Sequence, residues 1–478
     1  MKLLFNPLFL AVIFITSSAM STADTLSDIY ELALKNDATL KQAEATYRAN
    51  IETKKQALSA ILPQIEAEGS YQKFDQESNG FTLDTSPNPS SLYVDSTSDK
   101  NTDTEVYSLS LTQQLFNLPA WFTFKSGKQT SKQAKAQLAF DQQDLIVRVA
   151  VAYFNVLRAQ DNLEASKAEE RATQRQLEQT QQRFDVGLIA ITEVHEARAV
   201  FDTTVVQRLT DEGNLGTSFE SLAVLTGQAP TNLWLLSNDF PISDPDPIAR
   251  NEWVQFALKN NYSLKAALHA MEAARQQATA KKMEHLPKVS GTFSYGDNST
   301  TGSVFSTPST SFNSVPPDSD SETEQFLIRL TMPIYSGGRI SSQRRQAYEQ
   351  YNIALQQKIN TQRQVVQNTR ASHITVATDV QRVKARAQAI VSTNSALEAT
   401  QAGYEVGTRN IVDVLNAQRR LFSAIRDYSN SRYDYVINML NLKQASGILS
   451  PQDVYDIDKW MVEAGSPTAN KYQQYLNR

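Results

Sequence analysis

The sequence predicts a mainly α-helical chain, made of two related halves, that contributes four strands to a small membrane β-barrel. One observation is a twelve-residue stretch that occurs twice, at Arg183–Val194 and at Gly403–Val414, with an offset of 220 residues. Another is a pair of alternating apolar and polar strands in each half. Between these strands and the repeated stretches lie long segments whose apolar residues step by four and three, which is typical of packed helices.

The similarity between the halves runs along most of the chain. Leu62-Pro63 and Leu286-Pro287 match at an offset of 224 residues, and an offset of 220 holds later, through Gly227 and Gly447. Two halves that keep register in this way indicate a duplication with one length-tolerant loop in each half. The predicted organisation is a signal peptide (1–23), a first repeat (24–227), a linker or equatorial segment (228–248), a second repeat (249–447) and a tail (448–478).

The N-terminus has the features of a secretory signal peptide. Lys2 precedes an apolar run from Leu3 to Ile15, and Ser21-Thr22-Ala23 fits a small-residue cleavage site before Asp24. The alternative is a retained anchor helix. It is disfavoured because the run is shorter than the roughly 20 residues needed to span a bilayer and Asn6-Pro7 interrupts it.

Composition excludes several classes of function. The chain has 46 Lys and Arg against 51 Asp and Glu, so it lacks the basic excess of a nucleic-acid-binding protein. It has no cysteine, which excludes disulfides and Cys-based metal sites. After the signal no apolar run is long enough to predict a membrane-spanning helix. We expect no cofactor and no metal, because we find no P-loop, no G-x-S-x-G and no H-E-x-x-H sequence.

Each half is predicted to follow the same order of elements. A first helix ends at Leu-Pro, because proline moves the preceding residue out of the helical region. A strand, a polar loop and a returning strand follow, and then two long helices flank the repeated stretch. The expected ranges are first helices at 25–61 and 249–285, loops at 73–104 and 297–322, a helix from about 125 to the turn at Gly187, and a short helix near 454–462.

The strands alternate as the strands of a membrane barrel do. Ile65, Ala67 and Tyr71 alternate with polar residues, and Phe326 and Ile328 do so in the other half. A half-buried hairpin in a soluble domain is the alternative, but two matching hairpins behind an export signal favour the barrel. Four strands cannot close a barrel, which needs about eight, so several chains must share one. Three chains would supply twelve strands.

The helical segments carry heptad seams for helix-on-helix packing. A helix from 125 to 187 would be roughly 90 Å long, which is too long for the core of one compact domain. The seams are Leu145, Val149, Ala152, Val156, Ala159 and Leu163; Val366, Thr369, His373, Val376, Val380, Val383, Ala387 and Ile390; and Val414, Ala417, Leu421, Ala424, Tyr428 and Ser431.

Together these features resemble the TolC family of trimeric outer-membrane channel-tunnels, and the resemblance covers nearly the whole mature chain. The two Val-Gly stretches carry it most specifically, with Leu-Pro before each first strand and Asn438–Lys443 near the end. The resemblance implies a homotrimer with a shared twelve-stranded barrel in the outer membrane and an α-helical tunnel in the periplasm. A periplasmic adaptor (membrane fusion) protein and an inner-membrane transporter of RND, ABC or MFS type would be the partners. Drugs, bile-salt-like amphiphiles or secreted proteins would be the substrates.

The resemblance also implies roles for residues at the two stretches. Tyr404 and Arg409 would close a periplasmic gate, with Thr192 and Glu193 as their partners. The adaptor would contact the tips at Val186, Gly187, Val406 and Gly407.

Asp413 would belong to an acidic ring at the entrance, where three copies near one axis would attract cations. The family pattern has a second Asp one helical turn later, where this chain has Asn416, so a full two-tier ring is not expected. Asp413 also has a plainer role, since Asn410 three residues earlier can cap a helix start and an acid there suits the helix dipole. The two roles are compatible.

Two other functions compete with the channel. A periplasmic coiled-coil scaffold or adaptor without a membrane barrel would use the hairpins as soluble elements. An exported hydrolase would require a catalytic constellation, and we find none. His195, His269 and His285 show no ligand spacing, and His373 lies on a heptad seam, where packing or contact with water is favoured over a metal-ligand role.

Overall fold

The computed structural model describes residues 24–463, apart from 84–88, 90, 231 and 308–317. The predicted signal peptide and the last part of the predicted tail, 464–478, therefore lie outside the described residues. The chain divides into two compact units, one made of Met1–Ala45, Gln137–Leu264 and Thr361–Arg478, and the other of Thr46–Ala136 and Lys265–Asn360. We call them the tip unit and the sheet unit. No helix in the described part of the chain combines the length and the apolarity that crossing a membrane requires.

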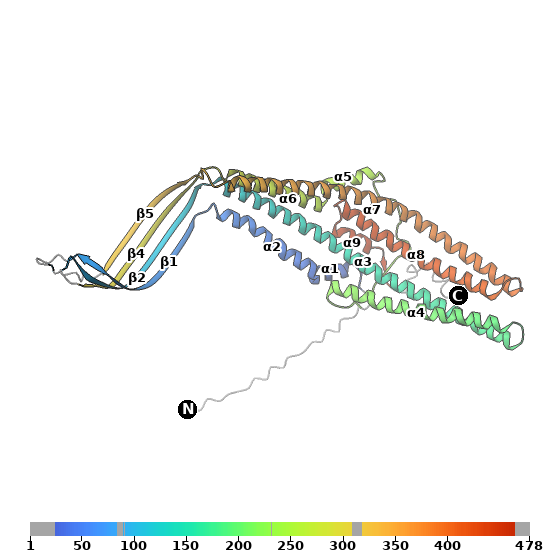
Figure 1. Ribbon diagram of the computed structural model, residues 1–478. Coiled ribbons are helices and arrows are strands. Elements are labelled where there is room, and N and C mark those ends of the chain that lie inside the picture. Colours follow the sequence, from blue (N-terminus) through green and yellow to red (C-terminus); the bar gives the residue numbers. More distant parts are fainter. Residues whose placement is uncertain (1–23, 84–88, 90, 231, 308–317, 464–478) are drawn as a thin grey trace, which may run out of the picture. The chain divides into compact units, whose positions relative to one another are not determined.

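The same order of elements occurs twice, as Figure 1 shows. The first series is α1 (Leu26–Asn36), α2 (Ala38–Ser59), β1 (Gln64–Leu83), β2 (Tyr93–Phe116), α3 (Leu118–Asp185) and α4 (Ile191–Thr226). The second is α5 (Arg250–Asn260), α6 (Tyr262–Met283), β4 (Lys288–Thr307), β5 (Ser319–Thr331), α7 (Arg339–Glu405) and α8 (Ile411–Ala445). The remaining elements are β3 (Leu235–Leu236), α9 (Pro451–Asp458) and β6 (Met461–Val462).

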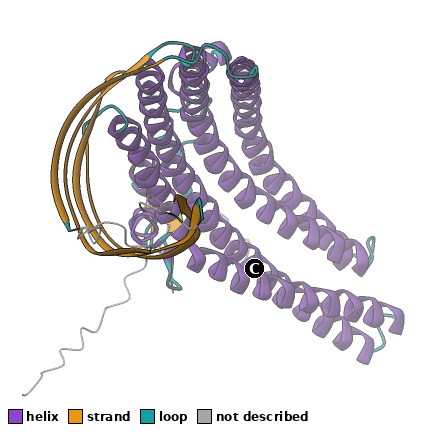
Figure 2. Ribbon diagram, turned by 60° about the vertical axis from the view of Figure 1, so that its left-hand side comes forward, coloured by secondary structure: helices purple, strands orange, loops and turns teal. Residues whose placement is uncertain are grey.

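The sheet unit contains an antiparallel four-stranded sheet in the order β1-β2-β4-β5, counted over the described residues. Figure 2 shows that these strands bend together into a curved sheet. Among the described residues, β1 and β5 each pair on one side only, so both sheet edges keep a row of backbone groups that do not pair within the chain.

The register of the sheet confirms the predicted alternation. Ile65 lies opposite Leu111, Leu111 opposite Phe293, and Phe293 opposite Phe326, so one apolar row crosses all four strands on one face. The neighbouring row, Glu66, Ser110, Ser294 and Gln325, is polar and lies on the other face. The apolar face is exposed in the single chain, and Phe326 keeps 71% of its surface accessible.

The predicted loops at 73–104 and 297–322 were wrong in extent. β1 runs to Leu83, β2 begins at Tyr93, β4 runs to Thr307 and β5 begins at Ser319. Asn, Asp, Gly and Pro are depleted in strands, and these segments are rich in them and in Ser, which is why they indicated loops. The ladder continues nonetheless, because β2 is paired on both sides over Thr97–Thr112.

The single first helix predicted for each half was also wrong, since each is two helices. The chain leaves the helical region at Asp37 (φ −58°, ψ 118°) and at Asn261 (φ −56°, ψ 124°). Each side chain then caps the next helix: Asp37 Oδ1 accepts a hydrogen bond from the Leu40 amide at 2.6 Å, and Asn261 Oδ1 accepts one from Leu264 at 3.0 Å. We call these positions the two kinks.

The predicted long helices and their seams are confirmed. α3 has 68 residues and α7 has 67, and within the tip unit each is followed by a second long helix. The seam residues form the core of that unit; those with at most 8% of their surface exposed include Leu145, Val149, Val156, Val376, Val380, Val383, Ile390, Val414 and Leu421. The predicted helix near 454–462 is α9, followed by the two-residue strand β6 that pairs with β3.

Candidate gate at the helical tips

The two repeated stretches fold into the same backbone turn in the tip unit. Gly187 and Gly407 adopt φ of 78° and 79°, the left-handed region in which glycine ends a helix without strain. In the first turn the Leu188 amide donates to the Arg183 carbonyl at 2.9 Å. In the second turn the Thr408 amide donates to the Gly403 carbonyl at the same distance. The predicted helix ends are therefore confirmed at both stretches.

The second turn carries side-chain bonds that the first does not. Thr408 Oγ1 donates to the Gly403 carbonyl at 3.0 Å, and Asn410 Oδ1 accepts from the Asp413 amide at 2.9 Å. The predicted Asn410 cap of α8 is thus confirmed. In the first turn Ala190 precedes α4, and within the described residues no side chain caps that helix. The first tip accordingly depends on its backbone bonds.

A small apolar core joins the helices just behind the turns. Ala197 of α4 and Ile411 and Leu415 of α8 are at most 2% exposed and pack together. Leu177 of α3 and Tyr404 of α7 pack against this cluster. The two hairpins of the tip unit are therefore in direct contact at their ends.

Tyr404 occupies the centre of this contact. Its ring packs against the Ala197 cluster and also against the cluster that contains Val414. The Arg183 guanidinium lies over the ring, 4.9 Å from its centroid, a cation–π contact. The Tyr404 hydroxyl is enclosed and has no hydrogen-bond partner among the described residues. It keeps a donor and an acceptor for a further group.

Arg409 and Asp413 lie on either side of the Asn410 cap, at the start of α8. Arg409 Nη1 is 3.8 Å from Asp413 Oδ2, and the two side chains are 61% and 39% exposed. An ion pair this long and this exposed stabilises little, so Arg409 is free to change partners. Gly403 lies directly under this arginine, since a Cβ there would be 2.8 Å from Arg409 Cγ.

The structure places Thr192 and Glu193 in the first turn of α4, with Thr192 exposed and Glu193 partly exposed. Among the described residues, no side-chain bond connects either of them to Tyr404 or Arg409. The partner of Tyr404 within the chain is Arg183, which sequence reasoning did not single out. The sequence feature that could have indicated Arg183 is its place in the last turn of a helix, immediately before the aromatic residue of the repeated stretch.

A polar groove of about 670 Å³ opens between the ends of α3 and α7. Four glutamines line it together with Arg183, Val186, Tyr404, Glu405 and Val414; the glutamines are Gln176, Gln179, Gln182 and Gln401. Val186 and Val406, the predicted contact residues at the tips, are 71% and 74% exposed. Two exposed valines beside an amide-lined groove can hold a partner helix by apolar contact and hydrogen bonds together.

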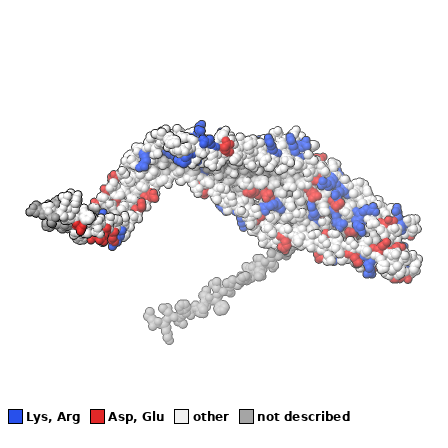
Figure 3. All heavy atoms as spheres, in the orientation of Figure 1, with Lys and Arg blue, Asp and Glu red and all other residues white. Residues whose placement is uncertain are grey.

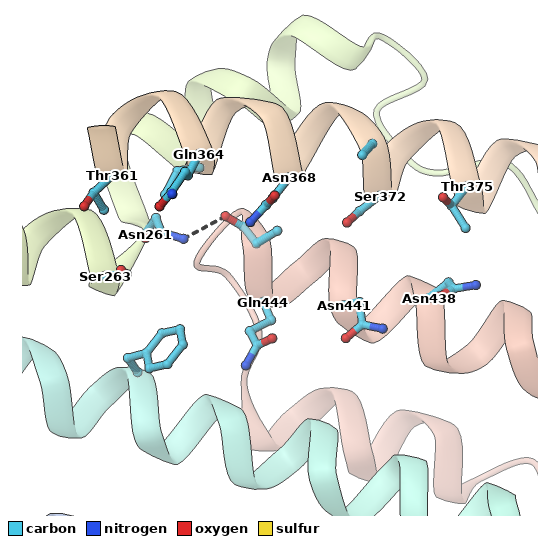
Figure 4. Close-up of a pocket in the computed structure, with 14 residues that line it drawn as sticks. Asn261, Ser263, Thr361, Gln364, Asn368, Ser372, Thr375, Asn438, Asn441 and Gln444 are labelled. Carbon is cyan, nitrogen blue, oxygen red and sulfur yellow. Dashed lines mark hydrogen bonds between the residues drawn. The ribbon is translucent and has the colours of Figure 1, made fainter. Parts of the chain in front are cut away.

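A second cavity of the tip unit, of about 480 Å³, lies at the second kink (Figure 4). No charged side chain of the described residues lines it, and ten of its fourteen lining residues carry an amide or a hydroxyl. Asn261 Nδ2 donates to the Ala445 carbonyl at 2.9 Å. Across the described residues, no group of three or more His, Cys, Asp or Glu side chains is arranged to hold a metal ion. His373 instead contacts the Ile248 carbonyl at 3.1 Å.

Comparison with known proteins agrees with this architecture. A sequence profile of the outer membrane efflux protein family matches residues 29–228 and 253–448. The outer membrane protein TolC of Vibrio cholerae is 37% identical over 456 residues, covering 95% of this chain and 97% of that protein. The alkaline protease secretion protein AprF of Pseudomonas aeruginosa is 26% identical, covering 93% and 89% of the two chains.

Solved structures share the fold. The outer membrane protein VceC of Vibrio cholerae superimposes with a TM-score of 0.69 at 18% identity, covering 88% of this chain and 96% of that one. CusC, a transmembrane channel, gives a TM-score of 0.71 at 18% identity, covering 89% and 92%. With a profile that matches most of the chain and a relative above 30% identity along nearly its whole length, this chain belongs to the outer membrane efflux protein family.

Proposed function

We propose that three copies of this chain form one channel in the outer membrane of a Gram-negative bacterium, with a helical tunnel in the periplasm. The observation that carries the proposal is the open four-stranded sheet. Its apolar rows suit lipid and its other face suits water, but its two edges would leave backbone groups unpaired in a bilayer. Pairing β1 of one copy with β5 of the next removes both edges, and three such sheets make a barrel of twelve strands.

The channel serves as the exit duct of tripartite drug efflux and type I secretion systems. Relatives named for both activities support this, since AprF is an alkaline protease secretion protein and BepC of Brucella suis is an outer membrane efflux protein. The energy comes from an inner-membrane transporter of RND, ABC or MFS type, joined to the channel by a periplasmic adaptor. The chain itself carries out no chemical step, because passage through an open duct needs none.

The tips are the gate of this duct. In the closed state Tyr404 and Arg409 bond to Thr192 and Glu193. Two observations support this assignment: the Tyr404 hydroxyl has no partner among the described residues, and the ion pair between Arg409 and Asp413 is long and exposed. The adaptor docks against Val186, Gly187, Val406 and Gly407, and docking parts the tips in a gating transition. The two ranges matched by the family profile support a chain built of two repeats, 24–227 and 249–447.

Single-channel recording in planar lipid bilayers tests the gate. Tyr404→Phe combined with Arg409→Ser is expected to raise conductance severalfold, because the closed state loses two of its bonds. A matched control, Tyr455→Phe with Arg250→Ser, changes the same residue types elsewhere and should leave conductance unaltered. Equal conductance in the gate variant and the wild type would remove Tyr404 and Arg409 from the gate.

Ion selectivity tests the entrance. Replacing Asp413 with Ala is expected to lower the preference for cations and the block by polyvalent cations, because the ring loses one charge from each copy. Asn416→Asp restores the second acid of the family pattern and should raise both. Unchanged selectivity in both variants would show that neither position lines the entrance.

A further inference from the structure

A basic groove of about 620 Å³ lies in the sheet unit, between the end of α6 and the start of α7. We call it the α6–α7 groove. Its lining includes Lys282, Arg344 and Arg345, and also Arg275, which donates to Glu272 at 2.7 Å. Among the described residues, Lys282, Arg344 and Arg345 form no ion pair, and Glu349 is the one carboxylate in the lining. Figure 3 shows basic side chains gathered over this strand–helix junction.

The fold does not require these charges. The first half builds the same pair of helices, α2 and α3, beside its own strands. At the repeat offsets of 224 and 220 residues, Leu58 stands for Lys282, Phe124 for Arg344 and Lys125 for Arg345. Both helix pairs carry basic residues near the junction, but at different positions, since Lys54, Lys55 and Lys128 stand where the second half has Ala278, Thr279 and Tyr348. The arrangement of positive charge around the α6–α7 groove is therefore specific to the second half.

The position of the groove relative to a membrane follows from the sheet. The apolar row that crosses all four strands starts at Ile65, the second residue of β1, so the apolar band begins at the strand–helix junction. Trp121, in the first turn of α3, lies at the same junction and is 44% exposed. Trp is enriched at membrane–water interfaces, so this residue also indicates the level of the interface. Lys125 follows one turn later, its Nζ 5.5 Å from the Trp121 ring centroid.

The groove residues lie within the same short distance of the junction. Lys282 is the last residue but one of α6, and Arg344 is five residues into α7, about 8 Å along the helix. A bilayer whose hydrocarbon covers the apolar rows therefore places its phosphates at the level of this groove.

The chemistry of the groove fits a phosphodiester. A guanidinium group can donate to two phosphate oxygens at once, as Arg344 and Arg345 could here. Lys282 adds a third positive charge to those of the two arginines. Tyr348 and Tyr351, with ring centroids 6.1 Å apart, border the groove and offer apolar surface with hydroxyl donors. We propose that the α6–α7 groove binds the head group of an anionic phospholipid from the leaflet on the helix side of the sheet. The proposal rests on the outer-membrane channel proposed above.

Native mass spectrometry of the full-length trimer tests this inference. The protein is extracted from vesicles of phosphatidylethanolamine, phosphatidylglycerol and phosphatidylcholine, and the lipids that stay bound are identified. The wild type is expected to retain phosphatidylglycerol and to release phosphatidylcholine. Arg344→Gln with Arg345→Gln should lower that retention about thirtyfold, since each basic residue near an anionic lipid surface contributes about 1 kcal/mol. Arg344→Lys with Arg345→Lys keeps the charge but loses the paired bonds, and should fall between the two.

The control is Lys54→Gln with Lys55→Gln. These lysines occupy the α2 positions that correspond to Ala278 and Thr279 of the groove, so the same charge is removed at the same level. Equal retention in the wild type and in Arg344→Gln with Arg345→Gln would overturn the inference. So would displacement of the lipid by inorganic phosphate or by an acidic peptide. A wild-type trimer that conducts ions but retains no phosphatidylglycerol overturns the lipid site alone, whereas a wild-type chain that forms no trimer also overturns the proposed function.

Discussion

The first helix of each half breaks at the same place in the repeat, at Asp37 in the first half and at Asn261 in the second. At the first kink Arg148 Nη1 and Nη2 donate to the two Asp37 oxygens at 3.0 and 3.1 Å, and Arg148 Nε donates to Asp144 at 2.8 Å. At the second kink the residues that stand for Arg148 and Asp144 are Asn368 and Gln364. They line the uncharged cavity shown in Figure 4.

The comparison separates what the fold needs from what each half adds. Both halves need a side-chain oxygen to cap the second helix, and Asp37 and Asn261 both supply it. Only the first half fills the surrounding space with a charged network. The tips differ in the same way. Both turns use a left-handed glycine, but only the second adds the side-chain bonds of Thr408 and Asn410.

The largest expected effect is at the first kink. Asp37→Ala removes the cap of α2 and leaves the Arg148 guanidinium without its buried partner, so we expect a loss of about 3 kcal/mol in unfolding free energy. Asn261→Ala removes a cap and one amide bond and should cost about 1 kcal/mol. Unfolding midpoints of the two variants, measured in the same detergent, compare them. Equal losses would contradict the distinction between an ionic and an amide kink.

Acid should affect the first kink selectively. Burial raises the pKa of Asp37, but its bonds from Arg148 and from the Leu40 amide outweigh burial and hold the pKa below its ordinary 3.8. A lowered folded-state pKa means that the contribution is complete above the ordinary value and is lost as pH falls from there through the folded value. The melting temperature of the wild type should therefore fall more steeply below about pH 4 than that of Asp37→Asn. Parallel curves would exclude this role for Asp37.

A smaller effect is expected at the tips. Asn410→Ala should destabilise the start of α8 by about 1 kcal/mol, and Ala190→Asn should stabilise the start of α4 by a similar or smaller amount. Hydrogen exchange of the amides in the first turns of both helices measures each change. The contrast between the tips would be wrong if Asn410→Ala left the protection of the Asp413 amide unchanged.

The smallest difference is expected between the two turn glycines. Gly187 and Gly407 have nearly equal φ, and no described atom lies within 4 Å of a Cβ built on either. Gly187→Ala and Gly407→Ala should each cost about 1 kcal/mol of local stability, from backbone strain alone. A clear inequality, measured by the same exchange experiment, would show that the turns differ in more than their side-chain bonds.

Much of the fold could be predicted from periodicity. The seams through Leu145, Val376 and Val414 required only steps of four and three, and the alternation around Ile65 required only steps of two. The kinks could not be found in this way, because Asp37 and Asn261 sit inside continuous helical patterns. Each is also held by a distant element, Asp37 by Arg148 and Asn261 by the Ala445 carbonyl. The sequence did hold a weak signal there, as Asn36-Asp37 and Asn260-Asn261 are pairs of capping residues at one repeat offset.

The candidate site could be predicted in part. Both Val-Gly turns and the Asn410 cap follow from local sequence, because glycine and asparagine act within one turn of chain. The contact between Arg183 and Tyr404 does not, since it joins residues on α3 and α7 that only the packing of the two hairpins brings together. The gate roles of Thr192, Glu193, Tyr404 and Arg409 and the ring role of Asp413 remain predictions.

The central claim is that the strands of three chains close into one barrel, and the most direct test is the mass of the unheated protein after extraction in detergent. We predict a particle of three mature chains that needs detergent for solubility and dissociates on heating. A single chain that stays soluble in water without detergent would contradict the account.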